Sequence, residues 1–311
     1  MEKRALGVSA FLTEITGLTG CGAGLASFSR QGQKSPGESR LDSSAPVIAG
    51  QEKKAVLVVS FGTSYRLSGE ASIGAVERAI AAAFPEYEVR RAYTSQVIID
   101  KLASRDNLEI DNVRQAMERL AGDGFDTVIC QPTHVVNGYE YDKMVRQITP
   151  YIGRFHSIKF GTPLLTSIED YRETVKALVA ELPALTEKEA VVLVGHGTEH
   201  YANATYSALD YRFQDDGFAN IFVGTVEGYP SMQSVLKQLK AKPEIEKVYL
   251  APLLIVAGDH ANTDIAGSEE GTWKTTLQSE GYSVEGILKG LGEYHGIREL
   301  FVKHVQAAVG G

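Results

Sequence analysis

The sequence predicts an α/β protein of two similar halves, each with a parallel β-sheet, and a cleft between the halves. Three observations predict this fold class. Strand-like apolar runs alternate with amphipathic helices, which is typical of βαβ units with right-handed crossovers. Phe61-Gly62-Thr63 follows the first strand as His196-Gly197-Thr198 follows a later one. The stretches 131–140 and 251–260 share their proline and glycine positions, with Glu140 opposite His260.

The first half is predicted over residues 53–184. Residues 54–60 are a buried-strand pattern, and Pro85 ends the helix that follows it. The inner face of that helix is predicted to hold Ile73, Val76, Ile80 and Phe84. A second helix is predicted to bury Ile110, Val113, Met117 and Leu120 before a strand over 127–130. A third is built on Ile168, Tyr171, Val175, Leu178 and Leu182.

The second half is predicted over residues 185–311 and carries the metal site. Its first strand, 190–194, is a run of five apolar residues that ends abruptly in Gly195-His196-Gly197. Open α/β sheets bind ligands at the carboxyl ends of their strands, so His196 lies where chemistry is expected. The last helix is predicted to be a capping element with Ile297, Leu300, Phe301 and Val305 facing inward.

Composition excludes several classes of function. The chain has 311 residues, 43% hydrophobic and 23% charged, as is normal for a globular protein. Its net charge of −8 argues against general nucleic-acid binding, which needs a basic face. Two cysteines give neither a disulfide framework nor a Cys-x-x-Cys pair, so any metal is expected on histidine and carboxylate. Phosphate-loop and dinucleotide motifs are absent, which disfavours ATP and nicotinamide chemistry.

The N-terminal segment has the order of an export signal. Residues 1–21 contain a basic start, a short apolar region and Leu-Thr-Gly-Cys, which resembles a bacterial lipoprotein signal with Cys21 as the lipidated residue. Residues 22–52 have the composition of a flexible linker. A periplasmic location is therefore expected, with a membrane contact only through Cys21, and a cytoplasmic one if the leader does not function. The sequence leaves the oligomeric state open, homo-oligomers included.

Polar residues gather just past the predicted strand ends, beside glycines. They are His134, Glu140, His196 and His260, and all four are expected to point toward the shared cleft. With Glu227 they make a mixed set of imidazoles and carboxylates that suits divalent Co, Ni, Fe or Zn. The alternative for each is a loop residue that caps a nearby helix. That alternative is favoured for Glu227 alone, and the metal site is favoured for His196 and His260 together.

Other histidines and the tryptophan lack this setting. His200 is expected to support the site or to face solvent, because Gly197 makes a helix through 196–200 unfavourable. His156, His295 and His304 are expected to be surface or helix residues. The single tryptophan, Trp273, is expected in the core or the cleft wall.

Four stretches in order carry a specific resemblance: 131–141, 194–204, 224–230 and 252–261. With them, the chain from about Lys53 onward resembles the sirohydrochlorin cobaltochelatases of the anaerobic cobalamin pathway, a family of class II chelatases. The resemblance implies two pseudo-symmetric α/β halves and insertion of a divalent metal into a tetrapyrrole without ATP. It also implies metal ligation by His196, Glu227 and His260, proton acceptance by His196 and a supporting catalytic role of Glu140.

This resemblance leads to a mechanism and to two alternatives. A neutral imidazole can hold the cation and then accept a proton, because its pKa lies near working pH. The carboxylates of the tetrapyrrole need basic or N–H partners, for which Arg66, Arg91 and Arg154 are candidates. The alternatives are a chelatase that inserts Fe²⁺ into sirohydrochlorin, and a non-enzymatic periplasmic carrier of metal or of a tetrapyrrole such as haem. Co²⁺ itself is expected as a substrate, with no further cofactor.

Overall fold

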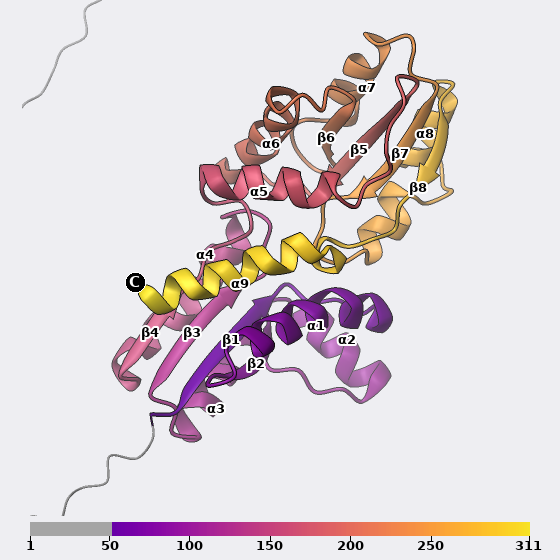
Figure 1. Cartoon of the computed structure of the whole chain (residues 1–311). Coiled ribbons are helices and arrows are strands. Elements are labelled where there is room, and N and C mark those ends of the chain that lie inside the picture. The colour runs from indigo at the N-terminus through magenta and orange to yellow at the C-terminus, as the bar shows by residue number, and fades with distance from the viewer. Residues whose placement is uncertain (1–51) are drawn as a thin grey trace, which may run out of the picture. The chain divides into compact units, whose positions relative to one another are not determined.

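The computed structural model describes residues 52–311 (Figure 1). The predicted signal segment, residues 1–21 with Cys21, and all of the predicted linker except residue 52 lie outside the described residues. None of the described helices is both long and apolar enough to span a bilayer.

Two four-stranded parallel sheets form the frame, and they share one topology. The first contains β1 (Lys54–Ser60), β2 (Glu88–Tyr93), β3 (Thr127–Pro132) and β4 (Ser157–Phe160), in the order β2-β1-β3-β4. The second contains β5 (Glu189–Gly195), β6 (Ile221–Thr225), β7 (Lys247–Pro252) and β8 (Ser283–Gly286), in the order β6-β5-β7-β8. The predicted fold class of two similar parallel α/β halves is confirmed.

This strand order indicates where a ligand can bind. From β1 the chain runs to β2 on one side of it, and from β3 it runs to β4 on the opposite side. The connections that leave β1 and β3 therefore diverge, and so do those that leave β5 and β7. Crevices at such a switch point, beyond the carboxyl ends of the strands, are the usual ligand sites of open α/β sheets. The segments after β1, β3, β5 and β7 are the four that the sequence repeat relates.

Helices cover both faces of each sheet (Figure 1). They are α1 (Arg66–Ala83), α2 (Gln96–Asp106), α3 (Val113–Gly122), α4 (Tyr139–Ile148), α5 (Ile168–Val179), α6 (Ala204–Asp215), α7 (Met232–Lys240), α8 (Trp273–Ser279) and α9 (His295–Gly310). Because both faces of the sheets are covered, the central strands can be apolar throughout. In β1, Val56 and Val58 point into a core shared by both halves, whereas Leu57 and Val59 point into the core beneath α3 and α4.

Most predicted helix faces are confirmed, with two exceptions. Ile73, Val76 and Ile80 are buried on α1. Ile110 precedes α3, which begins at Val113 after the capping residue Asn112. Ile168 is 79% exposed, because it is the first residue of α5 and follows the capping Ser167 on the outer side of the helix. Trp273 is buried in the core of the second half, as predicted.

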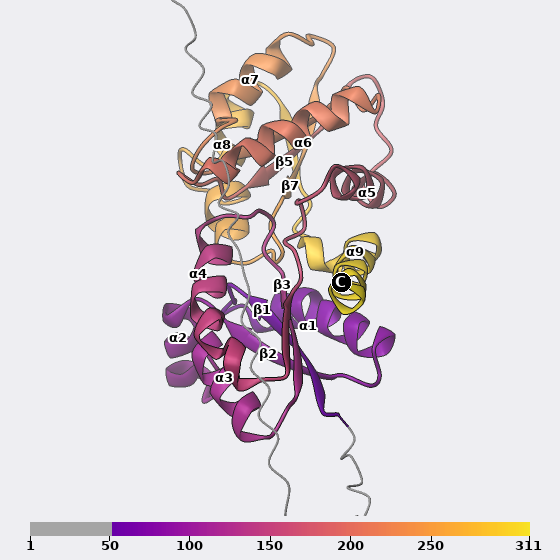
Figure 2. The same ribbon diagram turned by 90° about the vertical axis from the view of Figure 1, so that its left-hand side faces the viewer.

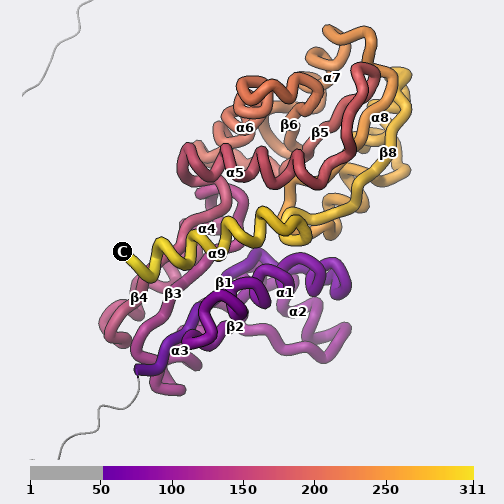
Figure 3. Tube along the Cα trace, in the orientation of Figure 1, coloured from indigo at the N-terminus to yellow at the C-terminus, as the bar shows by residue number. Residues whose placement is uncertain are grey.

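The chain crosses between the halves twice, once after β4 and once after β8 (Figure 3). The second crossing leads into α9, which lies between α5 and α1 in both ribbon views and packs against both and against β3 (Figures 1 and 2). The last helix, predicted as a capping element with its apolar residues facing inward, thus packs against elements of both halves. Apolar residues of α1, α5, α6 and α9 form one continuous core with both sheets, so the described residues belong to a single compact unit.

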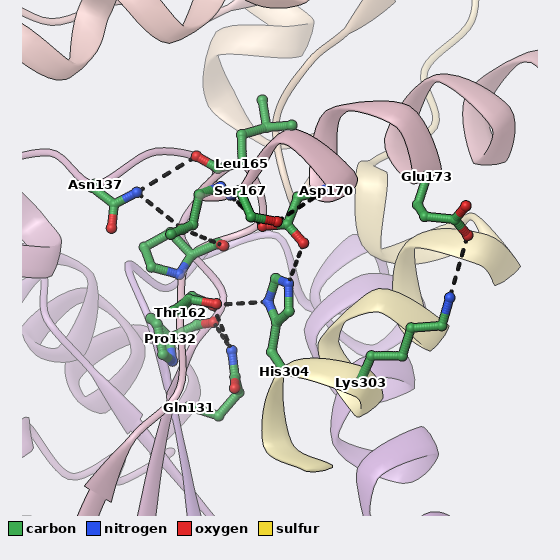
Figure 4. Close-up of polar contacts among 12 residues, drawn as sticks. Gln131, Pro132, Asn137, Thr162, Leu165, Ser167, Asp170, Glu173, Lys303 and His304 are labelled. Carbon is green, nitrogen blue, oxygen red and sulfur yellow. Dashed lines mark hydrogen bonds and ion pairs between the residues drawn. The ribbon is translucent and has the colours of Figure 1, made fainter. Parts of the chain in front are cut away.

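A buried contact between His304 and Asp170 links α9 to α5, the helices that follow the two crossings between the halves (Figure 4). On α9, His304 contacts the Asp170 carboxylate through Nε2 at 2.9 Å and the Thr162 carbonyl through Nδ1 at 3.0 Å. Both partners are acceptors, so each ring nitrogen of His304 is placed where it can donate. Burial raises the pKa of Asp170, but hydrogen bonds from His304 and Ser167 outweigh it and hold this pKa below its ordinary value. His304 is therefore not a surface residue but a buried link between α9 and α5.

Candidate functional site

A cavity of about 750 Å³ lies at the switch points of the two sheets. Its walls come mainly from residues within four segments that directly follow strands: 60–65, 133–140, 196–199 and 253–260. A cavity of this size, between the carboxyl ends of two sheets, is typical of a site for a substantial small molecule. His196, Glu227, His260 and Glu140 all line it, as the sequence predicts, and so does His134.

Two histidines of the second half lie side by side in the cavity wall. His196 follows β5, and His260 precedes the π-helical turn Ala261–Ile265 after β7. Their ring centroids are 4.6 Å apart and the ring planes cross at 85°. Residues more than sixty positions apart in sequence thus present two imidazoles to one point of the cavity.

Each of these imidazoles has one nitrogen fixed and one free. The Nδ1 atom of His196 donates to the Gly197 carbonyl at 2.9 Å, and Nδ1 of His260 donates to Asp264 at 2.7 Å. A backbone carbonyl and a carboxylate oxygen are acceptors, so in the neutral form of each ring the N–H lies on Nδ1 and the lone pair on Nε2. Histidines that bind metals commonly have their second nitrogen fixed in this way, which sets the tautomer and orients the ring.

Asp264→Ala is expected to lower the affinity for Co²⁺ about 10- to 100-fold, because it removes the acceptor that orients His260. Calorimetric titration of the purified protein with Co²⁺ measures this. The matched control is Asp215→Ala, which removes a carboxylate from the surface of α6, outside the cavity lining. Equal affinities of the two variants would show that Asp264 does not support a ligand.

The backbone of Glu227 is hydrogen-bonded to the loop that carries His196. Its N–H donates to the His196 carbonyl at 2.7 Å, and its exposed side chain lines the cavity. Within residues 52–311, no three His, Cys, Asp or Glu side chains are grouped closely enough to hold a metal ion together. The two imidazoles are thus paired in the structure, and ligation by Glu227 stays a prediction.

The first half contributes a carboxylate to the cavity. Glu140 lies in the first turn of α4, and its Oε2 atom is 3.6 Å from Nζ of Lys143, which donates to the Thr94 carbonyl. The Oε2 atom is shielded from solvent and accepts no hydrogen bond. The Glu140 side chain as a whole is 34% exposed, so it is partly accessible to solvent although its Oε2 atom is buried.

His134, also in the first half, is held neutral. It follows β3, and its carbonyl accepts the backbone N–H of Leu164 at 2.9 Å. The residue is partly exposed, but both ring nitrogens are shielded from solvent and neither has a hydrogen-bond partner. Burial lowers the pKa of His134 to about 4, although Glu140 raises it and Lys143 lowers it further. The ring is therefore uncharged at neutral pH.

This neutral ring predicts an acid-sensitive fold. The folded-state pKa is about 4 and the unfolded one about 6.5, so between these values the unfolded chain binds more protons. The free energy of unfolding should fall as pH is lowered through this window, by up to about 3 kcal/mol from this residue. In urea titrations at pH 7 and pH 5, the free energy of unfolding of His134→Leu should decrease less between the two pH values than that of the wild type. Equal falls in the variant and the wild type would contradict the assignment.

His200 is buried, not solvent-facing. Its ring lies 3.9 Å from that of Tyr201 and 4.9 Å from that of Tyr139, and its Nε2 is 3.6 Å from Asp142. Tyr139 and Asp142 belong to α4, so His200 joins the second half to the first beside the cavity. A second link is the hydrogen bond from the Tyr65 hydroxyl to Asp259 at 3.0 Å.

The expected basic partners of the substrate are not in the cavity. Within the described chain, no lysine or arginine lines it. Arg91 is paired with Glu77 at 2.6 Å, and Arg154 is paired with Glu118 at 2.7 Å. The donors there are hydroxyls and backbone N–H groups of Ser60, Thr63, Ser64, Tyr65, Thr133 and Thr198. Of these, the hydroxyls of Tyr65 and Thr133 already donate to Asp259 and Ser60. Carboxylates of a ligand would meet these donors or reach past the rim.

Comparisons with known proteins agree with this geometry. The sequence is 41% identical to the sirohydrochlorin cobaltochelatase of Salmonella typhimurium over 257 residues, which are 83% of this chain and 97% of that protein. It is 32% identical to the sirohydrochlorin cobaltochelatase CbiKC of Nitratidesulfovibrio vulgaris over 262 residues, 83% of this chain and 91% of that protein.

Solved structures show the same fold. SirB from Bacillus subtilis, determined with Fe³⁺, superimposes with a TM-score of 0.56 at 14% identity, over 82% of this chain and 95% of SirB. DR2241 from Deinococcus radiodurans, described as similar to chelatases, gives a TM-score of 0.52 at 15% identity, over 82% of this chain and 55% of DR2241. The family described as cobalt chelatase (CbiK) matches residues 54–310, and the chain belongs to this family.

Proposed function

We propose that this protein inserts Co²⁺ into sirohydrochlorin, without ATP or a nicotinamide cofactor, in the synthesis of cobalamin. The observation that carries the proposal is the pair His196 and His260, whose rings lie 4.6 Å apart on the wall of a cavity of about 750 Å³, each with its Nε2 atom free. The names of both curated relatives support the substrate and the metal.

In the proposed mechanism, the second half holds the metal and the cavity holds the macrocycle. Nε2 of His196, Nε2 of His260 and the Glu227 carboxylate bind Co²⁺, and the remaining coordination positions stay open for ring nitrogens. A site with few protein ligands favours transfer, because a closed set of four would retain the ion. As the ring nitrogens bind the metal, the ion gives up its water and protein ligands and the macrocycle loses two N–H protons. His196, once its imidazole has released the ion, accepts a proton and passes it to solvent, and the second proton leaves in the same way.

The cavity wall suits a large, partly apolar ring. Val135, Val136, Ile255 and Val256 line it together with the polar residues, and their side chains can pack against the faces of a macrocycle. A bound macrocycle that displaces water from this wall would strengthen the interactions of the metal with its ligands, because it lowers the local dielectric constant. Two contacts between the halves lie at the cavity, the hydrogen bond of Tyr65 and the packing of His200.

Purified protein, sirohydrochlorin and Co²⁺, mixed anaerobically without ATP, test the proposal through the absorption spectrum. Cobalt insertion should convert the spectrum of the free macrocycle to that of its cobalt complex at a rate proportional to enzyme concentration. Faster conversion with Fe²⁺ would favour an iron chelatase. Tight binding of metal or macrocycle without conversion would favour a carrier and overturn the proposal.

We also propose a periplasmic location with a lipid anchor at Cys21. The support is the lipoprotein-like order of residues 1–21 alone. Mass spectrometry of the mature N-terminus isolated from the native cell tests it. A chain that begins at a diacylated Cys21 is the expected result, and an intact Met1 in the cytosolic fraction would overturn it.

A further inference from the structure

Phe61 is an aromatic residue that the protein leaves uncovered inside the cavity. It directly follows β1 and lines the cavity, and 50% of its surface is exposed. Within residues 52–311, its side chain belongs to none of the hydrophobic core clusters. Tyr139, the other exposed aromatic residue of the lining, packs against His200. The Phe61 ring is thus an apolar surface that a ligand in the cavity can cover.

The backbone holds Phe61 in a fixed position. Its carbonyl accepts the Ser95 N–H at 3.2 Å, in the loop that follows β2. The next residue, Gly62, has a φ of +101°, and a Cβ atom there would lie 2.5 Å from the ring of Tyr93. A side chain on such a segment is already in place before a ligand arrives, so binding orders little of the backbone.

The two halves contribute different walls to the cavity. By the sequence repeat, Phe61 stands where the second half has His196, and the two residues follow the equivalent central strands β1 and β5. One position of the frame thus carries a phenyl ring in the first half and an imidazole with a free nitrogen in the second. Further apolar residues of the first half line the cavity with Phe61: Ile73, Ile98, Val135 and Val136.

This apolar wall fits the faces of a tetrapyrrole better than its edge. The faces of the macrocycle are apolar and conjugated over part of the ring, whereas the carboxylates lie on the periphery. A phenyl ring packs on such a face and contributes more than its buried area alone. Since no lysine or arginine of the described chain lines the cavity, the faces are the part of the substrate that this wall can recognise.

Resting on the proposed function, we propose that Phe61 is a positioning residue whose ring packs on one face of sirohydrochlorin. The opposite face is then turned toward His196 and His260, so Co²⁺ held by this pair reaches the ring nitrogens from one side. Phe61 neither binds the metal nor accepts a proton. Its removal should therefore weaken binding of the macrocycle and leave binding of Co²⁺ unchanged.

The first test compares Phe61→Ala, Phe61→Leu and Phe61→Tyr with the wild type. Phe61→Ala should raise the Kd and KM for sirohydrochlorin about 10- to 30-fold, because half of a phenyl ring is no longer available for burial. Phe61→Leu keeps apolar volume without the ring and should raise them about 3- to 10-fold. Phe61→Tyr keeps the ring and should bind like the wild type.

The same variants separate positioning from general damage. At saturating sirohydrochlorin, kcat of Phe61→Ala should fall about 3- to 10-fold, because a loosely held macrocycle faces the ion less often, and Phe61→Tyr should restore it. The Kd for Co²⁺ alone should stay within about twofold of wild type in all three. Tyr211→Ala is the matched control, since Tyr211 is a 70% exposed aromatic residue of α6 outside the cavity lining.

A second measurement locates the macrocycle without turnover. In a Cys21→Ser background, Phe61→Cys introduces a thiol in the cavity, and the remaining Cys130 is buried. Sirohydrochlorin at ten times its Kd should slow maleimide labelling of the introduced thiol about tenfold. Tyr211→Cys should be labelled at the same rate with and without the macrocycle.

Wild-type Kd and KM for sirohydrochlorin in Phe61→Ala, or labelling of Phe61→Cys that the macrocycle does not slow, would overturn the role of Phe61. Weakened Co²⁺ binding in Phe61→Ala would overturn it as well, because the substitution would then act on the whole cavity. Wild-type protein that binds both substrates without turnover would instead overturn the proposed function. The labelling and binding data distinguish these failures.

Discussion

Alanine in place of His196 or His260 is expected to abolish cobalt insertion. Either change removes one of two imidazoles whose rings lie 4.6 Å apart in the cavity wall and whose Nε2 atoms are free. Groups that merely orient a metal ligand contribute 10- to 100-fold to metal affinity, so loss of a ligand itself should cost more than about 100-fold. The spectrum of sirohydrochlorin should then stay unchanged over the time in which the wild type completes conversion.

Binding measurements separate this effect from general damage. Both variants should still bind sirohydrochlorin, because the apolar wall and the hydroxyl donors remain, but they should bind Co²⁺ weakly. His156→Ala serves as the control, since His156 is exposed and lies outside the cavity. Turnover above a tenth of the wild-type rate in both variants, with the fold intact, would rule out the histidine pair as the metal site.

Gly197→Ala is expected to lower the rate of cobalt insertion by nearly as much as these substitutions, although it changes no metal ligand and acts only through the backbone. Gly197 has a φ of +83°, and a Cβ atom there would lie 1.7 Å from the Glu227 carbonyl oxygen and 2.4 Å from its carbon. The loop that carries His196 and the loop that carries Glu227 would have to separate. Misplacement of reacting groups by about 1 Å can cost about 100-fold in rate, and we expect a loss of that size.

Gly217→Ala is the matched control for backbone strain. Gly217 has a similar φ of +88°, but a Cβ atom there would have no other atom within 4 Å. The variant should lose about 1–2 kcal/mol of stability, the usual cost of alanine in the left-handed region, and keep its activity. If Gly197→Ala keeps wild-type turnover, the close approach of the two loops is not required for metal insertion.

The sequence predicted those parts of the fold that depend on patterns within a short stretch of the chain. Both faces of the central strands are covered, so β1 and β5 are unbroken apolar runs that stand out against the helices. The repeat between the halves predicted the shared topology. β2 was not predicted, because it is the edge strand of its sheet and carries the partly exposed Arg90 and Arg91.

The two central histidines of the candidate site were also predictable from short sequence patterns. Glycines beside strand ends mark His196 and His260, and the repeat places the segments that carry them in one cleft. Asp264 was missed, although its spacing of four residues after His260 is a usable signal on a helical turn. With that spacing in view, the orientation of the ring could have been inferred as well.

Contacts between distant segments left no signal in the sequence. His304 is paired with Asp170, 134 positions away, and His200 packs against Tyr139 of the other half. His200 was expected to support the site or to face solvent, and His304 to be a surface or helix residue. Neither pairing was predicted, because neither residue has a periodic or glycine-framed setting. Arg91 and Arg154, two of the candidate partners for the substrate carboxylates, are paired with acidic residues of other elements, and these pairings also left no signal in the sequence.

X-ray absorption at the cobalt edge of the Co²⁺-loaded protein tests the central claim most directly. We expect a mixed shell with two imidazole nitrogens and carboxylate or water oxygens, at distances near 2.0–2.2 Å by analogy with other late divalent ions. In His196→Ala and His260→Ala, one imidazole should disappear from the shell. A shell of oxygens alone in the wild type, or one unchanged in both variants, would contradict the assignment of the metal to this histidine pair.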